Sequence, residues 1–309
     1  MKKQAKKFLF ITFLIGFMTQ IMILFPFAAQ SASKKVLDQT GRTITVPVAP
    51  ERIVALAPSI TEIIFALGKK DLLKGVTVFS DYPLEAAKKF KVGTYIRLDL
   101  ERIVSLSPDL CIAIKDGNPL ETVQRLEKLN IPVYAVNPRS LESVMDAILG
   151  IGKLVNAQPV AEKIVRKMKH RIDLIKKQVE KIENRPKVFF QIGVSPIVAA
   201  GDATFIHELI TVAGGNNLSK GPTPYPRFNR EQVLALSPDI LLITSMARNE
   251  VFEQVKAEWE RWPKIPAVKN GRIHILDSNV LDRPGPRMVE GLELLFSVIH
   301  PKTADQGRH

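Results

Sequence analysis

Aromatic side chains and prolines stand in loops that follow predicted strands in both halves of the chain. Rigid side chains of this kind line pockets for large, flat, amphipathic ligands. Asp282 and Arg283 add polar groups to a late loop of the same character. These positions predict a ligand pocket built from strand-end loops. The candidate residues of the pocket are Tyr82, Tyr95, Tyr225, Phe228, Pro83, Pro224, Pro226 and Pro284.

Two glutamates occupy matching places in a repeated sequence pattern. The first copy, ERIVSLSPDL, begins at Glu101, and the second, EQVLALSPDI, begins at Glu231. A carboxylate in the first turn of a helix interacts favourably with the helix dipole, so each glutamate can be explained by helix stability alone. The same charge at matching points of two lobes also suits a two-fold partner with arginine-lined sockets. Both interpretations remain open on the residues alone.

Motifs that would indicate catalysis or a bound metal are missing from the sequence. No glycine-rich phosphate loop of the usual spacing occurs, and no Gly-x-Ser-x-Gly elbow. The histidines are isolated, and a protein zinc site needs clustered ligands. The single cysteine, Cys111, lies within a predicted strand and has no disulfide partner in the chain. The sequence therefore predicts a binding protein that is not an enzyme and has no cofactor or metal of its own.

One long amphipathic helix, predicted from Pro159 to Glu183, separates the two copies of the pattern. Its apolar residues recur at steps of three and four, and its opposite face is basic. About 25 residues at about 1.5 Å each give a rod of about 38 Å. Short strands alternate with helices on both sides of it, which predicts parallel sheets covered by helices. We expect an α/β fold with an N-terminal lobe over 34–157, a linking helix over 158–185 and a C-terminal lobe over 186–309.

Several element boundaries follow from local signals. Apolar runs predict strands at Arg52–Leu56, Leu110–Ile114, Lys187–Ile192 and Ile240–Thr244. Pro58 and Ser59 open a helix, and Glu62 three residues after Ser59 fits a capping box. We therefore expect Glu62 to be a helix cap and not a functional residue.

The first 33 residues read as a secretory signal, with lysines, then an apolar run, then small residues. The apolar run is also long enough to span a membrane, so an uncleaved anchor is the alternative. No cysteine stands directly after the run, so we expect no lipid anchor and a periplasmic location. The formal charge of +13 permits nucleic-acid binding, but no motif supports it.

From about Lys35 to His300 the chain resembles the periplasmic substrate-binding proteins of ABC importers that have a helical backbone. This family takes up iron-siderophores, haem and cobalamin, and within it the chain looks closest to the cobalamin binders. The resemblance is carried by the opening stretches 38–42 and 50–59 and by SDYP at 80–83, LERIV at 100–104, DGN at 116–118, AGG at 213–215, PYP at 224–226, REQVL at 230–234 and PR at 286–287.

The resemblance implies a class III periplasmic binding protein fold, with the ligand held between two lobes and little hinge motion. It implies that cobalamin, or a related corrinoid, is the transported ligand, held mostly by aromatic contacts. Glu101 and Glu231 would dock on arginines of the permease dimer, whose ATPase subunits use the ATP. We expect a monomer that binds no nucleic acid. The residues that match ligand-contact positions are Tyr82, Tyr95, Tyr225 and Arg283.

Two alternatives keep parts of this interpretation. The same fold could carry a ferric siderophore or haem, because tyrosine replaces tryptophan at Tyr95 and Tyr225. A membrane-anchored enzyme or sensor with an ectodomain of this fold is the other alternative.

Overall fold

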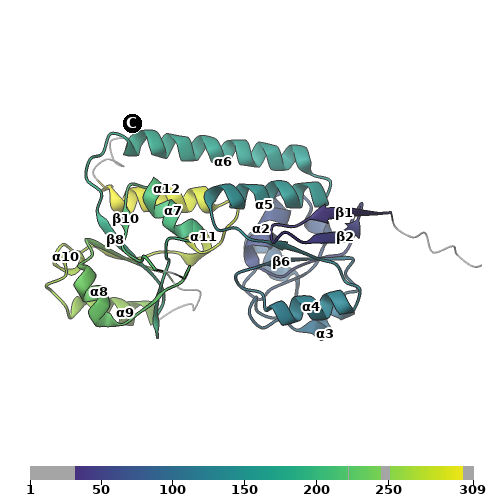
Figure 1. Ribbon diagram of the computed structural model, residues 1–309, viewed down its shortest axis with the longest axis horizontal. Helices are drawn as coiled ribbons and strands as arrows, with labels where there is room; N and C mark the ends of the chain where they lie inside the picture. The colour runs from purple at the N-terminus through teal and green to yellow at the C-terminus, as the bar shows by residue number, and fades with distance from the viewer. Residues whose placement is uncertain (1–31, 222, 245–250, 302–309) are drawn as a thin grey trace, which may run out of the picture. The chain divides into compact units, whose positions relative to one another are not determined.

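Strands and helices alternate along the computed structural model of the protein, which describes residues 32–221, 223–244 and 251–301. Figure 1 shows the arrangement of these elements. Lys34–His309 forms one compact unit by its internal contacts. The predicted signal segment lies outside the described residues except for its last two positions. Among the described helices, none is both long and apolar enough to cross a membrane.

The first half of the unit contains a five-stranded sheet whose strands are all parallel, in the order β5-β4-β3-β6-β7. A separate two-stranded sheet, β1 and β2, precedes it. The strands are β1 (Ser33–Leu37), β2 (Thr43–Pro47), β3 (Ile53–Ala55), β4 (Leu73–Val76), β5 (Phe90–Lys91), β6 (Leu110–Ile114) and β7 (Val133–Val136). The helices are α2 (Pro58–Ala66), α3 (Leu100–Ser105), α4 (Leu120–Lys128) and α5 (Leu141–Leu154), with short 3-10 turns at Lys70–Leu72 and Leu84–Lys88.

The second half contains a six-stranded sheet that is only partly parallel. Its main path is β11-β9-β8-β12-β13, and β10 pairs with β8. Strands β10, β12 and β13 join in parallel, whereas β9 and β11 join antiparallel and were not predicted from the sequence. The strands are β8 (Lys187–Gly193), β9 (Ile197–Ala199), β10 (Asn216–Asn217), β11 (Arg227–Phe228), β12 (Ile240–Ile243) and β13 (Ile273–Ile275). The helices are α7 (Phe205–Val212), α8 (Arg230–Leu236), α9 (Val251–Glu260), α10 (Pro266–Lys269), α11 (Ser278–Leu281) and α12 (Met288–Ile299).

Helix α6 (Gln158–Val179) connects the two halves and packs on α5, α7 and α12. Figure 1 shows it running alongside α5 of the first half and α12 of the second. The helix ends before the predicted Glu183, so that part of the prediction is wrong. The chain leaves the helix at Glu180, and the Ile182 amide then donates to the Val179 carbonyl at 3.0 Å. This turn still lets Ile182 pack against the core while the chain heads for β8.

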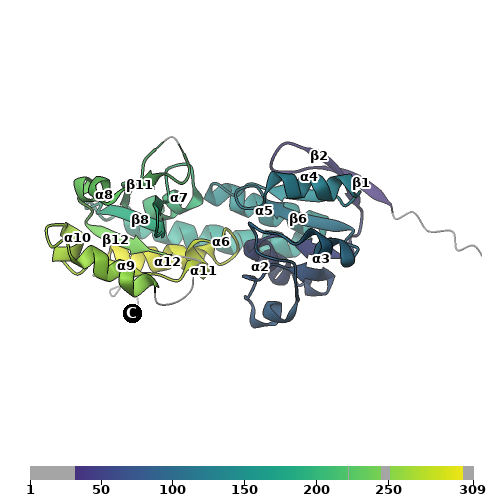
Figure 2. The same cartoon turned by 90° about the horizontal axis from the view of Figure 1, so that it is seen from below.

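The strand side chains alternate between two faces of each sheet, as the period of two requires. Ile112 of β6 faces a core that also receives α2, α5 and α6, whereas Cys111 faces a separate core under α3 and α4. In the second half, Phe190 of β8 faces the first of these cores, and Phe189 faces a third core that contains Trp259. The core on α6 is therefore continuous between the halves. Figure 2 shows the outer helices α3 and α4 with β6, and α8 and α9 with β8 and β12.

The predicted capping box at the start of α2 is wrong. The N-cap is Ala57, two residues before Ser59, so Pro58 and Ser59 both lie in the first turn, and no side chain caps the helix. Glu62 is buried, and its carboxylate binds arginines from the second half of the chain. Glu62 therefore forms tertiary ion pairs, although the local sequence pattern predicted that it caps the helix.

Candidate functional site

A cavity of about 740 Å³ opens at the carboxyl ends of the central strands of both sheets. Ala57 lies just after β3, Ile114 ends β6, and Gly193 ends β8. Open α/β sheets bind ligands at this edge, because the loops that leave the strands gather there. Its lining is mostly apolar and comes from both halves of the unit. Three of the four predicted ligand-contact residues, Tyr95, Tyr225 and Arg283, line it together.

The position of Tyr95 is set by the loop that follows β6. The Asn118 side-chain amide donates to the Tyr95 carbonyl and to the Leu56 carbonyl, each at 2.8 Å, and its oxygen accepts from the Ile114 amide at 2.8 Å. Gly117 lies against the ring, since a Cβ there would come within 2.9 Å of Tyr95 Cδ2. In the sequence, Asp116–Asn118 was notable only as one of the stretches that carry the family resemblance. In the structure, its residues Gly117 and Asn118 hold Tyr95 in the cavity wall.

Tyr225 comes from the loop that leads into β11. The Gly201 amide donates to the Pro224 carbonyl at 2.8 Å, and the Ala199 amide donates to the Pro226 carbonyl at 3.0 Å, so backbone bonds clamp both neighbours of the tyrosine. Burial raises the pKa of Tyr225 to about 12, and burial also raises the pKa of Tyr95. Both phenols are therefore neutral hydrogen-bonding groups at physiological pH.

Both arginines of the cavity wall are held by carboxylates of the protein itself. Arg139 binds Asp116 at 2.8 Å. Arg283 donates to Glu62 at 2.9 Å and binds Asp81 at 3.0 Å, and its side chain is only 6% exposed. These ion pairs leave no signal in the sequence, because Glu62 has an equally good local role and Asp116 stands far from Arg139 in the chain.

Tyr82, the fourth predicted contact residue, does not line this cavity. Its ring packs under the guanidinium of Arg287, with the Arg287 Cζ atom 3.7 Å from the ring centroid. Arg287 in turn donates to both oxygens of Glu62 at 2.8 Å. Tyr82 is thus linked to the cavity wall through Arg287 and Glu62.

The fourth charged residue of the wall is Asp282. Its Oδ1 accepts a hydrogen bond from the Thr244 hydroxyl at 2.9 Å. Burial raises the pKa of Asp282 to about 7, and Asp277 adds to the shift, while Thr244 and Arg283 partly oppose it. The carboxyl therefore exists in both protonation states near neutral pH.

The two repeated glutamates lie outside the cavity, on exposed helix starts. Glu101 is in the first turn of α3, where Asp99 caps the helix by accepting from the Arg102 amide. Glu231 is in the first turn of α8, where Asn229 and Gln232 form a capping box. Neither glutamate forms an ion pair with another residue in the described part of the chain. The caps are supplied by neighbours, which leaves both carboxylates free to meet a partner.

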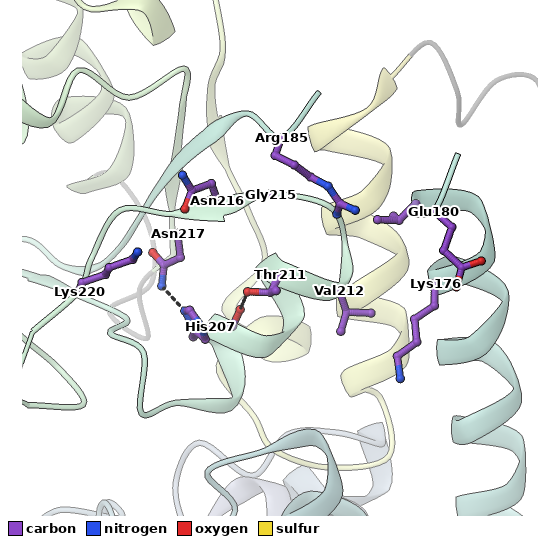
Figure 3. A pocket seen from close by; sticks show the side chains of 11 residues that line it. Lys176, Glu180, Arg185, His207, Thr211, Val212, Gly215, Asn216, Asn217 and Lys220 are labelled. Atoms are coloured by element: carbon purple, nitrogen blue, oxygen red, sulfur yellow. Dashed lines mark hydrogen bonds between the residues drawn. The ribbon is translucent and has the colours of Figure 1, made fainter. Parts of the chain in front are cut away.

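A second cavity, of about 730 Å³, lies between the end of α6 and the second sheet. Figure 3 shows its side chains, with Lys176, Arg185 and Lys220 coming from separate segments and not converging on one point. The His207 ring nitrogen and the Asn217 amide are 3.2 Å apart and bind each other. This arrangement offers no set of groups that would hold one ligand, so the candidate site is the first cavity. In the described parts of the chain, no group of three His, Cys, Asp or Glu side chains is placed to hold a metal ion.

Comparison with known proteins supports a solute-binding fold. A model of the periplasmic binding protein family matches residues 53–280. A vitamin B12-binding protein of Vibrio campbellii (strain ATCC BAA-1116) is 32% identical over 243 residues, which cover 78% of this chain and 86% of the relative.

Two solved structures show the same architecture. The periplasmic vitamin B12 binding protein BtuF of Vibrio cholerae has a TM-score of 0.72 and 28% identity, and the match covers 84% of this chain and 100% of that one. The periplasmic heme-binding protein RhuT from Roseiflexus sp. RS-1 has a TM-score of 0.73 and 28% identity, with 82% and 99% covered. The predicted α/β fold of the class III type is thereby confirmed. The chain belongs to the periplasmic binding protein family, whose members are solute-binding proteins.

Proposed function

We propose that the protein captures cobalamin, or a closely related corrinoid, in the strand-end cavity and delivers it to an ABC importer in the periplasm. The observation that carries the choice of ligand is the pairing of both cavity arginines, Arg139 with Asp116 and Arg283 with Glu62 and Asp81. A pocket for an anionic ligand needs unpaired cations, because burying a carboxylate without a counter-charge is costly.

The charge balance separates the two ligand classes that share this fold. Haem carries two propionates, and many ferric siderophores are anionic. The periphery of a corrinoid carries neutral amides, which need hydrogen-bond partners and apolar contact more than positive charge. The solved relatives include a vitamin B12 binder and a heme binder at nearly equal similarity, so the fold alone favours neither. The paired arginines favour the corrinoid.

The aromatic wall fits the same ligand. Tyr95 and Tyr225 line a mostly apolar cavity, and aromatic side chains gain affinity from area and ring contacts with little loss of side-chain entropy. Asn118 and the backbone bonds beside Tyr225 fix both loops before a ligand arrives. Affinity would then come from preorganised burial, with little closure of the two halves.

Glu101 and Glu231 are proposed as the docking residues for the two permease subunits. They are exposed, occupy equivalent first turns of α3 and α8, and have no ion-pair partner among the described residues. A permease dimer that presents an arginine to each would use them as charge-assisted contacts. The protein would act as a monomer and a carrier without catalysis, and the importer would consume the ATP.

Equilibrium dialysis of the purified protein against cyanocobalamin, followed at the visible absorbance of the corrin, tests the ligand. We expect saturable uptake of one corrinoid per protein. Retention of hemin or a ferric hydroxamate under the same conditions, with no retention of cyanocobalamin, would contradict the corrinoid assignment and favour haem or a siderophore as the ligand.

A further inference from the structure

Helix α6 carries more than half of the net charge of the compact unit. The formal charge of +13 includes the four lysines of the predicted signal segment, which leaves +9 for residues 34–309. The 22 residues of α6 include seven Lys or Arg and two Asp or Glu, a net charge of +5. Among the described residues, only two of these seven bases form ion pairs, Arg166 with Glu162 and Arg171 with Glu293. The five lysines of the helix therefore present positive charge that the protein itself does not neutralise.

Five exposed side chains form a straight row along the outer side of α6. They recur at steps of four and three residues, which return to the same side of a helix. The buried residues of α6, such as Val165 and Ile172, lie on the opposite side and pack in the core. The row is about 21 Å long, because each residue advances the helix by about 1.5 Å. We call this set the basic row, and its members are Lys163, Lys167, His170, Leu174 and Lys177.

The basic row points away from the proposed docking glutamates. Helix α6 packs on the core that both halves share, whereas Ile103 of α3 and Val233 of α8 lie in the separate cores on the other faces of the sheets. Figure 1 shows α6 along one side of the unit and α3 and α8 along the other. In the part of the chain that the structure describes, no side chain of the row lines either cavity. A partner on the row therefore leaves Glu101, Glu231 and the ligand cavity free.

The composition of the row fits an extended anionic surface better than a single carboxylate. Lysine is a compact, hydrated charge that needs no fixed geometry, whereas recognition of one carboxylate favours the planar fork of arginine. Leu174 is 46% exposed in the middle of the row, at a place where an apolar side chain can rest among lipid headgroups. The apolar side of α6 is buried in the core, so the helix cannot insert into a bilayer. Contact with a membrane would therefore be peripheral and electrostatic.

The chain enters the compact unit beside the start of α6. The Lys34 ammonium donates to the Val48 carbonyl at 3.4 Å and to the Lys153 carbonyl, in the last turn of α5, at 3.3 Å. The side-chain amide of Asn156, just before α6, donates to the same Val48 carbonyl at 3.2 Å. The apolar run that precedes Lys34 is expected to be a signal or, in the alternative, a membrane anchor. The point at which such an anchor would join the unit is next to the basic helix, and stable anchoring commonly uses a second, polybasic contact.

We propose that the basic row of α6 binds the anionic phospholipid surface of a membrane and holds the protein there with its docking glutamates directed away from that surface. Each lysine near the surface multiplies the partition coefficient by about 5-fold, so the three lysines of the row together contribute on the order of 100-fold. Salt weakens the attraction, because it screens charges that lie outside the protein. The inference does not rest on the proposed function, since it makes no use of the ligand.

Co-sedimentation with vesicles tests the proposal on the protein from Lys34 onward, which contains all three cores and lacks the apolar run that would bind lipid by itself. The vesicles are phosphatidylcholine alone, or phosphatidylcholine with about 30% phosphatidylglycerol, at about 0.05 M and about 0.5 M salt. We expect binding only to the anionic vesicles and only at the lower salt concentration.

Two triple variants with the same change of charge identify the surface. Replacement of Lys163, Lys167 and Lys177 by Gln should lower the partition coefficient on the order of 100-fold. The matched control replaces three exposed lysines of other elements by Gln and should lower it by less than about 5-fold. Both variants should bind cyanocobalamin as the wild type does, which separates this test from the test of the proposed function. The control lysines are Lys88, Lys128 and Lys269.

A fluorescent reporter in the row gives an independent readout. Leu174→Trp should shift its emission to the blue when anionic vesicles are added, whereas Leu120→Trp, at an exposed position of α4, should not. Equal losses of vesicle binding in the two triple variants, or the same emission shift at both positions, would overturn the assignment to α6. No binding to anionic vesicles at the lower salt concentration would overturn the proposal, also if the protein were retained on an acidic polymer such as heparin.

Discussion

Glu62 and Arg283 lie 221 residues apart in the chain and form an ion pair of 2.9 Å whose side chains are 3% and 6% exposed. Arg287 adds two further bonds to the same carboxylate, and Asp81 adds a second partner to Arg283. This network joins α2 of the first half to the loop before α12 of the second, beside the ligand cavity. The cavity wall is therefore fixed by buried charge pairs as well as by the core on α6.

Removal of the Glu62 charge should destabilise the protein strongly. In Glu62→Gln, Arg287 keeps no carboxylate among the partners described, and Arg283 keeps Asp81. Breaking a buried pair costs about 3–5 kcal/mol, because the remaining charge stays desolvated. We expect the free energy of unfolding in urea to fall by about this amount. Glu85→Gln is the control, since the Lys70–Glu85 pair is exposed and its loss should leave the midpoint nearly unchanged. A Glu62→Gln variant as stable as the control would contradict the network.

Tyr95 and Tyr225 should matter for corrinoid binding more than Tyr82. Each of the first two lines the cavity, so substitution by Ala removes ring contacts and apolar area worth about 1–2 kcal/mol, or roughly 5- to 30-fold in Kd. Tyr82→Ala removes the ring under Arg287, outside the cavity, and should change Kd less. Titration of the three variants with cyanocobalamin gives the order. A loss at Tyr82 that exceeds both others would place the ligand elsewhere.

Docking should depend on Glu101 and Glu231 without any effect on ligand binding. Replacing both by Arg reverses two exposed charges on helix starts that Asp99 and Asn229 already cap. Against an arginine socket on each permease subunit, like charges should abolish corrinoid uptake into proteoliposomes that contain the importer. Titration with cyanocobalamin should give the wild-type Kd. Normal uptake by the double variant, or loss of its affinity for cyanocobalamin, would refute the docking assignment.

Stability should decrease as pH rises through the range where Asp282 titrates. The pKa of Asp282 is raised from 3.8 to about 7 by folding, so the folded state holds a proton that the unfolded state has lost. Between about pH 4 and about pH 7 this carboxyl therefore lowers the free energy of unfolding by about 2–4 kcal/mol as pH rises. Below about pH 4 both states are protonated, and the contribution vanishes. Asp282→Asn should be more stable than the wild type at about pH 8 and similar to it at about pH 4, as urea titrations at both pH values would show. The same difference at both pH values would argue against the shift.

Cys111 should be inert while the protein is folded. It is fully buried in the strand β6, and burial raises the pKa of its thiol, so little thiolate forms. A chromogenic thiol reagent should react only as the protein unfolds, and the reaction should follow the urea transition. Rapid reaction in the absence of urea would show that the core under α3 and α4 opens locally.

The strands of the two sheets were predictable because they are buried on both faces and read as continuous apolar runs. The predicted Leu110–Ile114 coincides with β6, and Lys187–Ile192 falls one residue short of β8. The antiparallel strands β9 and β11 were missed, because neither is a fully buried apolar run: β11 has only two residues, and two of the three residues of β9 are only partly buried. Their pairing comes from tertiary contact, which leaves no periodic signal in the sequence.

The site was predictable at its aromatic residues and not at its charge pairs. Tyrosines in strand-end loops indicate a pocket whatever their partners are, and Tyr95 and Tyr225 line the cavity, whereas Tyr82 does not. The role of Glu62 was hidden by a local pattern, Ser59 with a glutamate three residues later, that fits a helix cap equally well. Only the fold shows that two arginines more than two hundred residues away bind this carboxylate.

The central claim is that the cavity binds a neutral corrinoid, and parallel calorimetric titrations of the purified protein with cyanocobalamin and hemin test it most directly. The account predicts one-to-one binding of cyanocobalamin at micromolar affinity or better, at least about 10-fold tighter than hemin. Tighter binding of hemin would contradict it, because paired cavity arginines would then accept an anionic ligand.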